Sequence, residues 1–148
     1  MFSHELLSSP ADFVLDTSRI SEIFAYIAQV VDIPQKGIMN IAFLSDDEIQ
    51  VLNREYRQID RTTDVLSFHY FDDFSAVEED MIAGEIIMSE SRILAQASEH
   101  GHTARQECEI LIIHGILHIL GFDHEDDADY VEMWKYESVI RTHFGLSV

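Results

Sequence analysis

Hydrophobic residues recur at the three- and four-residue spacing of an amphipathic helix in five stretches of the chain. Ser18 is a predicted N-cap, and Ser45 with Glu48 and Thr103 with Gln106 each spell a capping box, which marks a helix start. The predicted helices cover 18–31, 45–57, 89–100, 103–121 and 126–144, with Tyr56 and Tyr130 among the side chains expected to face the core.

Strand patterns lie between these helices. The segments 38–44, 63–68 and 84–89 are rich in β-branched and aromatic residues, and the acidic stretch 72–80 is typical of an exposed loop. No repeat or linker divides the chain. The pattern therefore predicts a single α+β domain over 1–148, with a small mixed β-sheet packed with about five helices.

Composition bears on the compartment. The hydrophobic content of 47% suits a globular core, and the single cysteine, Cys108, rules out an internal disulfide. The N-terminus carries no basic segment followed by a long apolar run, and the apolar stretch 110–122 is short for a membrane span. We expect a soluble, cytoplasmic protein without a membrane partner.

The charge of the chain argues against strong attraction to nucleic acid. With 28 acidic residues against 9 Lys and Arg, the formal net charge is −19, which repels phosphate backbones at long range. Three of these cations, Arg54, Arg57 and Arg61, are nevertheless close together. They form either a local basic site or an ordinary solvated helix face.

The histidines of the predicted fourth helix carry the clearest chemistry. His114 and His118 are four residues apart and project from one helix face, so that both imidazoles can reach one ion. Gly121 can take the left-handed conformation that ends a helix, which turns the chain and brings His124 back to the pair. The spacing H-x-x-x-H-x-x-G-x-x-H therefore predicts a three-histidine site for a divalent metal.

Three neutral nitrogens leave the fourth tetrahedral position open for water, which is typical of a catalytic zinc site. Nickel or iron also suits imidazole ligands. In the alternative interpretation, His114 and His118 are hydrogen-bonded core residues and His124 is a surface residue. His100 and His102, which flank Gly101, are predicted to be surface residues.

The same spacing occurs in metzincin proteases, whose general base is a glutamate directly after the first histidine. This chain has Gly115 at that position, so proteolysis is disfavoured. Asp123 and Glu125 flank the third histidine, and each is either a base or ligand-orienting group, or a capping or solvated acid.

Residues 114–124 resemble the motif of the YbeY family of bacterial rRNA maturation factors and endoribonucleases. The blocks 52–57, 63–68 and 84–89 resemble other blocks of that family in the same order, so that the resemblance covers most of residues 40–140. His69, Tyr70 and Phe71 stand where many relatives have a proline after the strand.

The resemblance implies a metal-dependent, single-strand-selective endoribonuclease that acts in maturation of the 16S rRNA 3′ end and in ribosome quality control. It implies zinc on His114, His118 and His124, and a functional role for Arg57 beside the metal cleft. Single-stranded rRNA, not DNA, is the expected partner, and the acidic charge suggests help from the ribosome or its proteins. A zinc metallopeptidase-like hydrolase and a ribosome-associated protein with a structural metal remain the alternatives.

Overall fold

A four-stranded mixed sheet forms the centre of the molecule. The structure, a computed structural model, describes residues 1–123 and 126–147. The strands are β1 (Ser3–Leu6), β2 (Ile38–Leu44), β3 (Val65–His69) and β4 (Ile82–Ser89), in the spatial order β1-β2-β4-β3. β1 pairs parallel with β2 and β2 parallel with β4, whereas β3 is antiparallel to β4 and forms one edge.

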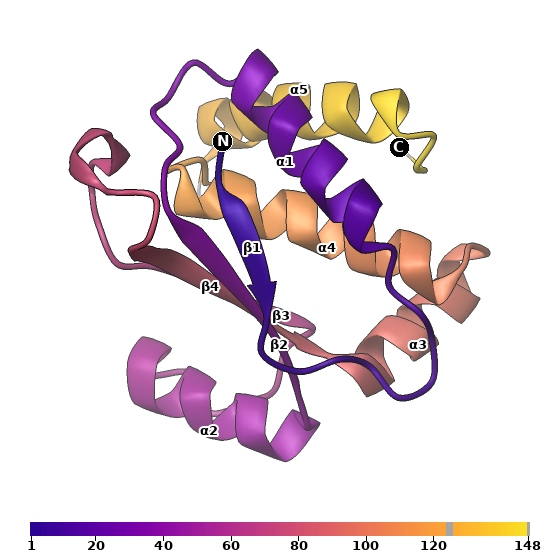
Figure 1. Ribbon diagram of the computed structural model, residues 1–148. Coiled ribbons are helices and arrows are strands. Elements are labelled where there is room, and N and C mark those ends of the chain that lie inside the picture. Colours follow the sequence, from indigo (N-terminus) through magenta and orange to yellow (C-terminus); the bar gives the residue numbers. More distant parts are fainter. Residues whose placement is uncertain (124–125, 148) are drawn as a thin grey trace.

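Helices cover both faces of this sheet (Figure 1). α1, α4 and α5 lie over one face and α2 lies against the other, while α3 leads from the end of β4 into α4. This arrangement confirms the predicted α+β class. The helices, with one short 3₁₀ turn in the acidic loop, are α1 (Thr17–Val30), α2 (Asp46–Arg57), η1 (Phe74–Ala76), α3 (Glu90–His100), α4 (Ala104–Ile119) and α5 (Asp127–His143).

The large core cluster lies between the sheet and the helices α1, α4 and α5. α4 runs through this cluster and is buried along most of its length, since it contacts β3, β4, α3 and α5. Ile112, Ile113 and Ile116 are fully buried, and each such side chain contributes about 1.5–3 kcal/mol of transfer free energy. A helix packed on so many sides gives its side chains fixed positions.

Local signals explain most helix starts and stops. Both predicted capping boxes are present: Ser45 with Glu48 opens α2, and Thr103 with Gln106 opens α4. Gly101 ends α3 in the left-handed region at φ 72°, as expected of a C-cap glycine. These signals involve neighbours within three or four residues, so the sequence alone specifies them.

Some local expectations were wrong. Asp16, not Ser18, caps α1, because its carboxylate accepts the backbone N–H of Arg19. β1 was not predicted, since its four residues alternate between exposed and half-buried positions without an apolar run. Tyr56 and Tyr130 are 64% and 56% exposed, so neither lies in the core.

Ion pairs to the buried carboxylate of Glu109 fix α1 against α4. The carboxylate of Glu109, whose side chain is 1% exposed, accepts hydrogen bonds from Nε and Nη2 of Arg19 and from Nη1 of Arg105. Arg19 also donates to the carbonyl of Phe144 at the end of α5. A buried carboxylate is tolerated only with such partners, so Glu109 sets how three helices approach one another.

Among the described residues, no helix combines the length and the apolar composition needed to cross a membrane.

Two glycines of the core give a matched test of packing. A Cβ added at Gly84 of β4 would lie 2.4 Å from the backbone oxygen of Phe68, whereas one at Gly115 of α4 would meet Ile86 at 3.5 Å, an ordinary contact. We expect Gly84→Ala to destabilise the fold by about 1–3 kcal/mol. Gly115→Ala should be neutral or stabilising by up to about 1 kcal/mol, because alanine is the better helix former.

Urea unfolding, followed by circular dichroism on metal-free protein, measures both variants. A Gly84→Ala protein as stable as the wild type would contradict the close approach of β3 to β4 at this position.

Candidate metal and RNA site

His114 and His118 converge from one face of α4. Their Nε2 atoms lie 3.1 Å apart, and the two ring centroids are separated by 4.6 Å in an edge-to-face arrangement. Two imidazole ligands of one tetrahedral zinc ion have nitrogens about 3.3–3.4 Å apart, given bonds of about 2.0–2.1 Å. The pair therefore has the geometry of two ligands of one ion, as the four-residue spacing predicts.

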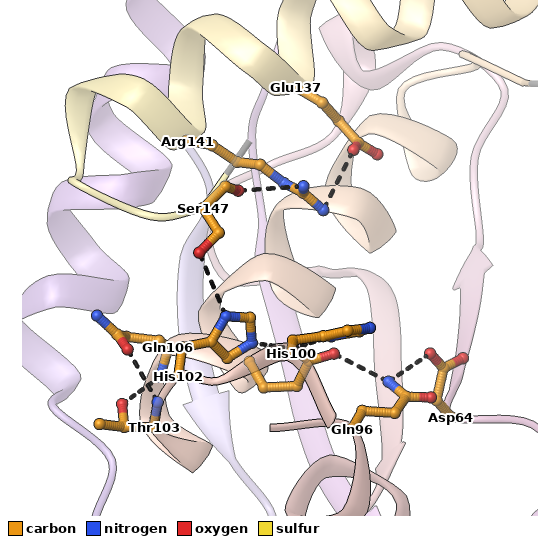
Figure 2. Close-up of polar contacts among 10 residues, drawn as sticks. Asp64, Gln96, His100, His102, Thr103, Gln106, Glu137, Arg141 and Ser147 are labelled. Carbon is orange, nitrogen blue, oxygen red and sulfur yellow. Dashed lines mark hydrogen bonds and ion pairs between the residues drawn. The ribbon is translucent and has the colours of Figure 1, made fainter. Parts of the chain in front are cut away.

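Glu137 of α5 orients the first of these imidazoles. Its Oε1 contacts Nδ1 of His114, which leaves Nε2 turned toward His118. Arg141, one turn further along α5, lies 3.6 Å from Oε2 of the same carboxylate and donates a hydrogen bond to the carbonyl of Ser147 (Figure 2). A carboxylate behind a ligating histidine fixes the ring and its tautomer, and it raises the basicity of the ligand.

The third predicted ligand, His124, lies outside the described residues, as does Glu125. The chain turns where the motif predicts it, since Gly121 has φ 102° and its N–H donates to the carbonyl of His118. Asp123 is half-buried and lines a small cleft of about 260 Å³ with Gly121 and Phe122. The three-histidine site and the role of Asp123 therefore stay predictions.

His114 lines a cleft of about 600 Å³ that also contains a second polar group. His100, His102 and Glu107 each offer a ligand atom, and these atoms all lie within 4.8 Å of one another. His100 is exposed, as predicted, but the side chain of His102 is only 8% exposed, so its prediction as a surface residue was wrong. Its ring is buried because its two nitrogens contact Glu107 and Ser147.

Glu107 is a buried carboxyl whose neighbours favour its charged form. Burial alone would raise the pKa of its carboxyl, but hydrogen bonds from His102, Gln96 and His100 hold that pKa below its ordinary value. The side chain is 3% exposed, so this carboxylate is largely shielded from water. A shielded carboxylate among imidazoles attracts cations strongly.

Arg57 is the last residue of α2, the helix that lies on the face of the sheet opposite α4. Its Nη2 donates a 2.8 Å hydrogen bond to the carbonyl of Ser67, and its guanidinium lies 5.9 Å from the ring centre of Phe68. These contacts hold the charged head in the lining of a second cleft, of about 690 Å³, that Arg61 and Arg92 also line. Three of the 9 cationic residues of the chain thus line one cleft.

The two clefts adjoin. Asp64, Val65 and Gln96 line both of them, so a continuous surface leads from Arg57 around β3 to His114. Gln96 stands at the junction, where its amide donates to Asp64 at 3.2 Å and to Glu107 at 2.9 Å (Figure 2). An extended anionic chain can lie along such a path and contact the arginines and His114 together.

Sequence reasoning missed Glu137, Glu107 and Asn53. Glu137 shares the buried face of α5 with Met133 and Ile140, and an acid at a core-facing position was a usable sign of a buried partner. Asn53 is 4% exposed and donates from Nδ2 to the carbonyl of Arg61, which shapes the loop after α2. No local sequence pattern predicts that contact.

Position 115 faces away from the cleft. A Cβ there would meet the side chain of Ile86 in β4, so a glutamate at this position would point into the apolar core. The chain therefore lacks the general base of a metzincin both in residue type and in the direction of the backbone at that position.

Comparison with known proteins places the chain among relatives of one kind. A family model described as endoribonuclease YbeY matches residues 12–145. The chain is 34% identical to endoribonuclease YbeY of Macrococcus caseolyticus, over 91% of this chain and 95% of the relative. It is 36% identical to endoribonuclease YbeY of Limosilactobacillus fermentum, over 87% and 88% of the two chains. The solution structure of TM1509 from Thermotoga maritima is similar at a TM-score of 0.56 and 27% identity, covering 97% of this chain and 91% of that one.

Proposed function

The chain belongs to the endoribonuclease YbeY family, and from this premise we propose that it is a metal-dependent, single-strand-selective endoribonuclease of ribosomal RNA maturation. Its action would include the 16S rRNA 3′ end and ribosome quality control, in the bacterial cytoplasm. One observation carries the proposal: the Nε2 atoms of His114 and His118 converge, and His114 lines a cleft that continues into the arginine-lined cleft of Arg57.

Described residues fit a divalent metal. His114 and His118 supply two nitrogens at a ligand-like separation of 3.1 Å, and Glu137 supports the first ring from behind. We assign His124 as the third ligand on the motif alone. One zinc ion per chain suits this all-nitrogen set, with nickel or iron as substitutes. When bound, such an ion lowers the pKa of water toward about 7 or polarises a phosphate oxygen.

Arg57 is the residue that we assign to the scissile phosphate. A guanidinium binds two phosphate oxygens in one plane, and it can offset the charge that develops as the phosphodiester is cleaved. Because the Ser67 carbonyl and the Phe68 ring already hold the side chain, little conformational entropy is lost when the phosphate binds.

The net charge of −19 makes the arginine cleft the part of the surface that favours RNA. Arg57, Arg61 and Arg92 attract the phosphates locally, while the acidic remainder weakens binding to free RNA. We therefore propose that the ribosome or one of its proteins positions the RNA strand for this enzyme.

RNA cleavage tests the two assigned roles. We expect His118→Ala and Arg57→Ala each to reduce kcat/KM on a single-stranded rRNA fragment by at least about 10²-fold, because each removes charge stabilisation of the reacting phosphate. The matched control is Arg54→Ala. Arg54 is exposed on α2, the helix of Arg57, pairs with Asp60 and lines neither cleft. The control variant should cleave at close to the wild-type rate.

All variants are purified identically, and the fragment is also offered as a duplex with its complement, which should resist cleavage. Equal activity in wild type and in both active-site variants would contradict the proposal and indicate a contaminating nuclease. A 2′,3′-cyclic phosphate on the product identifies the RNA 2′-hydroxyl as nucleophile, whereas its absence from the earliest products identifies water.

Metal affinity tests the role of Glu137. We expect Glu137→Gln to weaken zinc binding by about 10–100-fold, because the amide no longer draws the Nδ1 proton of His114 as a carboxylate does. Competition against a chromophoric zinc chelator measures the affinity, and Glu55→Gln, an exposed acid of α2, is the control. Unchanged affinity would mean that Glu137 only fills space between α5 and α4.

Metal removal separates a catalytic ion from a structural one. α4 is anchored by fully buried apolar side chains such as Ile112, Ile113 and Ile116, so chelation should leave the far-ultraviolet circular dichroism unchanged. The melting temperature should fall only by the mass-action stabilisation that the bound ion supplied. Unfolding on chelation would instead favour the ribosome-associated protein with a structural metal.

A further inference from the structure

We propose that His100, His102 and Glu107 form a second divalent-cation site, separate from the histidine pair of α4. Glu107 lies near the start of α4 and His100 at the end of α3, with Gly101 turning the chain between His100 and His102. The three ligand atoms lie within 4.8 Å of one another.

The arrangement of side chains around Glu107 also suits a bound ion. Its Oε1 already accepts the Gln96 amide, so both imidazoles turn to the remaining oxygen, Oε2. Nδ1 of His100 lies 3.3 Å from that oxygen, and Nε2 of His102 contacts it as well. Two imidazole nitrogens and one carboxylate oxygen around a common point are the His₂Glu set that zinc accepts.

The second nitrogen of His102 fits the same interpretation. Nδ1 lies 3.4 Å from the hydroxyl of Ser147, so it can carry the proton while Nε2 offers its lone pair (Figure 2). This contact supports a ligating His102 in the way that Glu137 supports His114.

The surroundings are both anionic and accessible. Asp64 and Glu99 line the same cleft as the three ligands and, with Glu107, outweigh the charge of Arg141, so the local charge favours a cation. His100 has a side chain that is 55% exposed, and the cleft of about 600 Å³ gives an ion a route of entry and room for a further oxygen ligand. Borderline ions such as Zn²⁺ and Co²⁺ are the class that this mixed nitrogen and oxygen set selects.

Metal counting with the first site disabled tests the proposal. Full-length protein carrying His114→Ala and His118→Ala is stripped with chelator, titrated with Co²⁺ and followed by its visible d–d absorption. It is then loaded with Zn²⁺, desalted and analysed for metal content. We expect one ion per chain and a cobalt spectrum of low-coordinate nitrogen and oxygen ligation.

Adding His100→Ala to this protein should reduce Co²⁺ affinity by at least about tenfold, because it removes one of three ligands. His100 is exposed, so this change spares the core, and circular dichroism confirms the fold of each variant. His69→Ala is the matched control, since His69 is also an exposed histidine and does not line this cleft. It should leave the affinity unchanged.

Two results would overturn the second site. Either the protein with His114→Ala and His118→Ala binds no Co²⁺ at millimolar concentration, or its binding is the same with and without His100. The outcome is independent of the first site, because the starting protein already lacks two of that site's ligands.

Discussion

The structure depends on a helix that is buried and yet carries ionisable side chains. α4 packs against β3, β4, α3 and α5, and along it stand Glu107, Glu109 and His114. Removing a charged group from water costs several kcal/mol unless partners replace the lost hydration. Each of these groups finds its partner on another element, so the demand for partners sets where α1, the α3–α4 turn and α5 lie.

The need of buried charged groups for partners also explains how an acidic protein can bind RNA. Acids that α4 buries are neutralised internally, as the contacts of Glu109 with Arg19 and Arg105 illustrate. Arg57, in contrast, is held by a backbone carbonyl and an aromatic ring, neither of which cancels its charge. Its guanidinium therefore remains available for phosphate, although the protein as a whole carries a net charge of −19.

The sequence predicted those features that arise from close neighbours along the chain. Both capping boxes, the strand 38–44 and the convergence of His114 with His118 depend on residues a few positions apart. The supporting partners could not be predicted in this way, because Glu137 meets His114 only once α5 has docked on α4. The buried His102 was missed for the same reason, since its surroundings come from Glu107, on the next helix, and from Ser147, near the end of the chain.

Placing both proposed ligand groups on one helix fixes their separation. Glu107 and His114 are about two turns apart on α4, so two ions held there would lie on the order of 10 Å apart. Two-metal phosphodiester chemistry needs ions about 3.5–4 Å apart, so these two cannot act on the same phosphate. An ion at Glu107 would instead offset the negative charge of Asp64 and Glu99 along the cleft that leads to His114. In this proposal, the rigidity of α4 places the chemistry at one end of the cleft and the charge balance at the other.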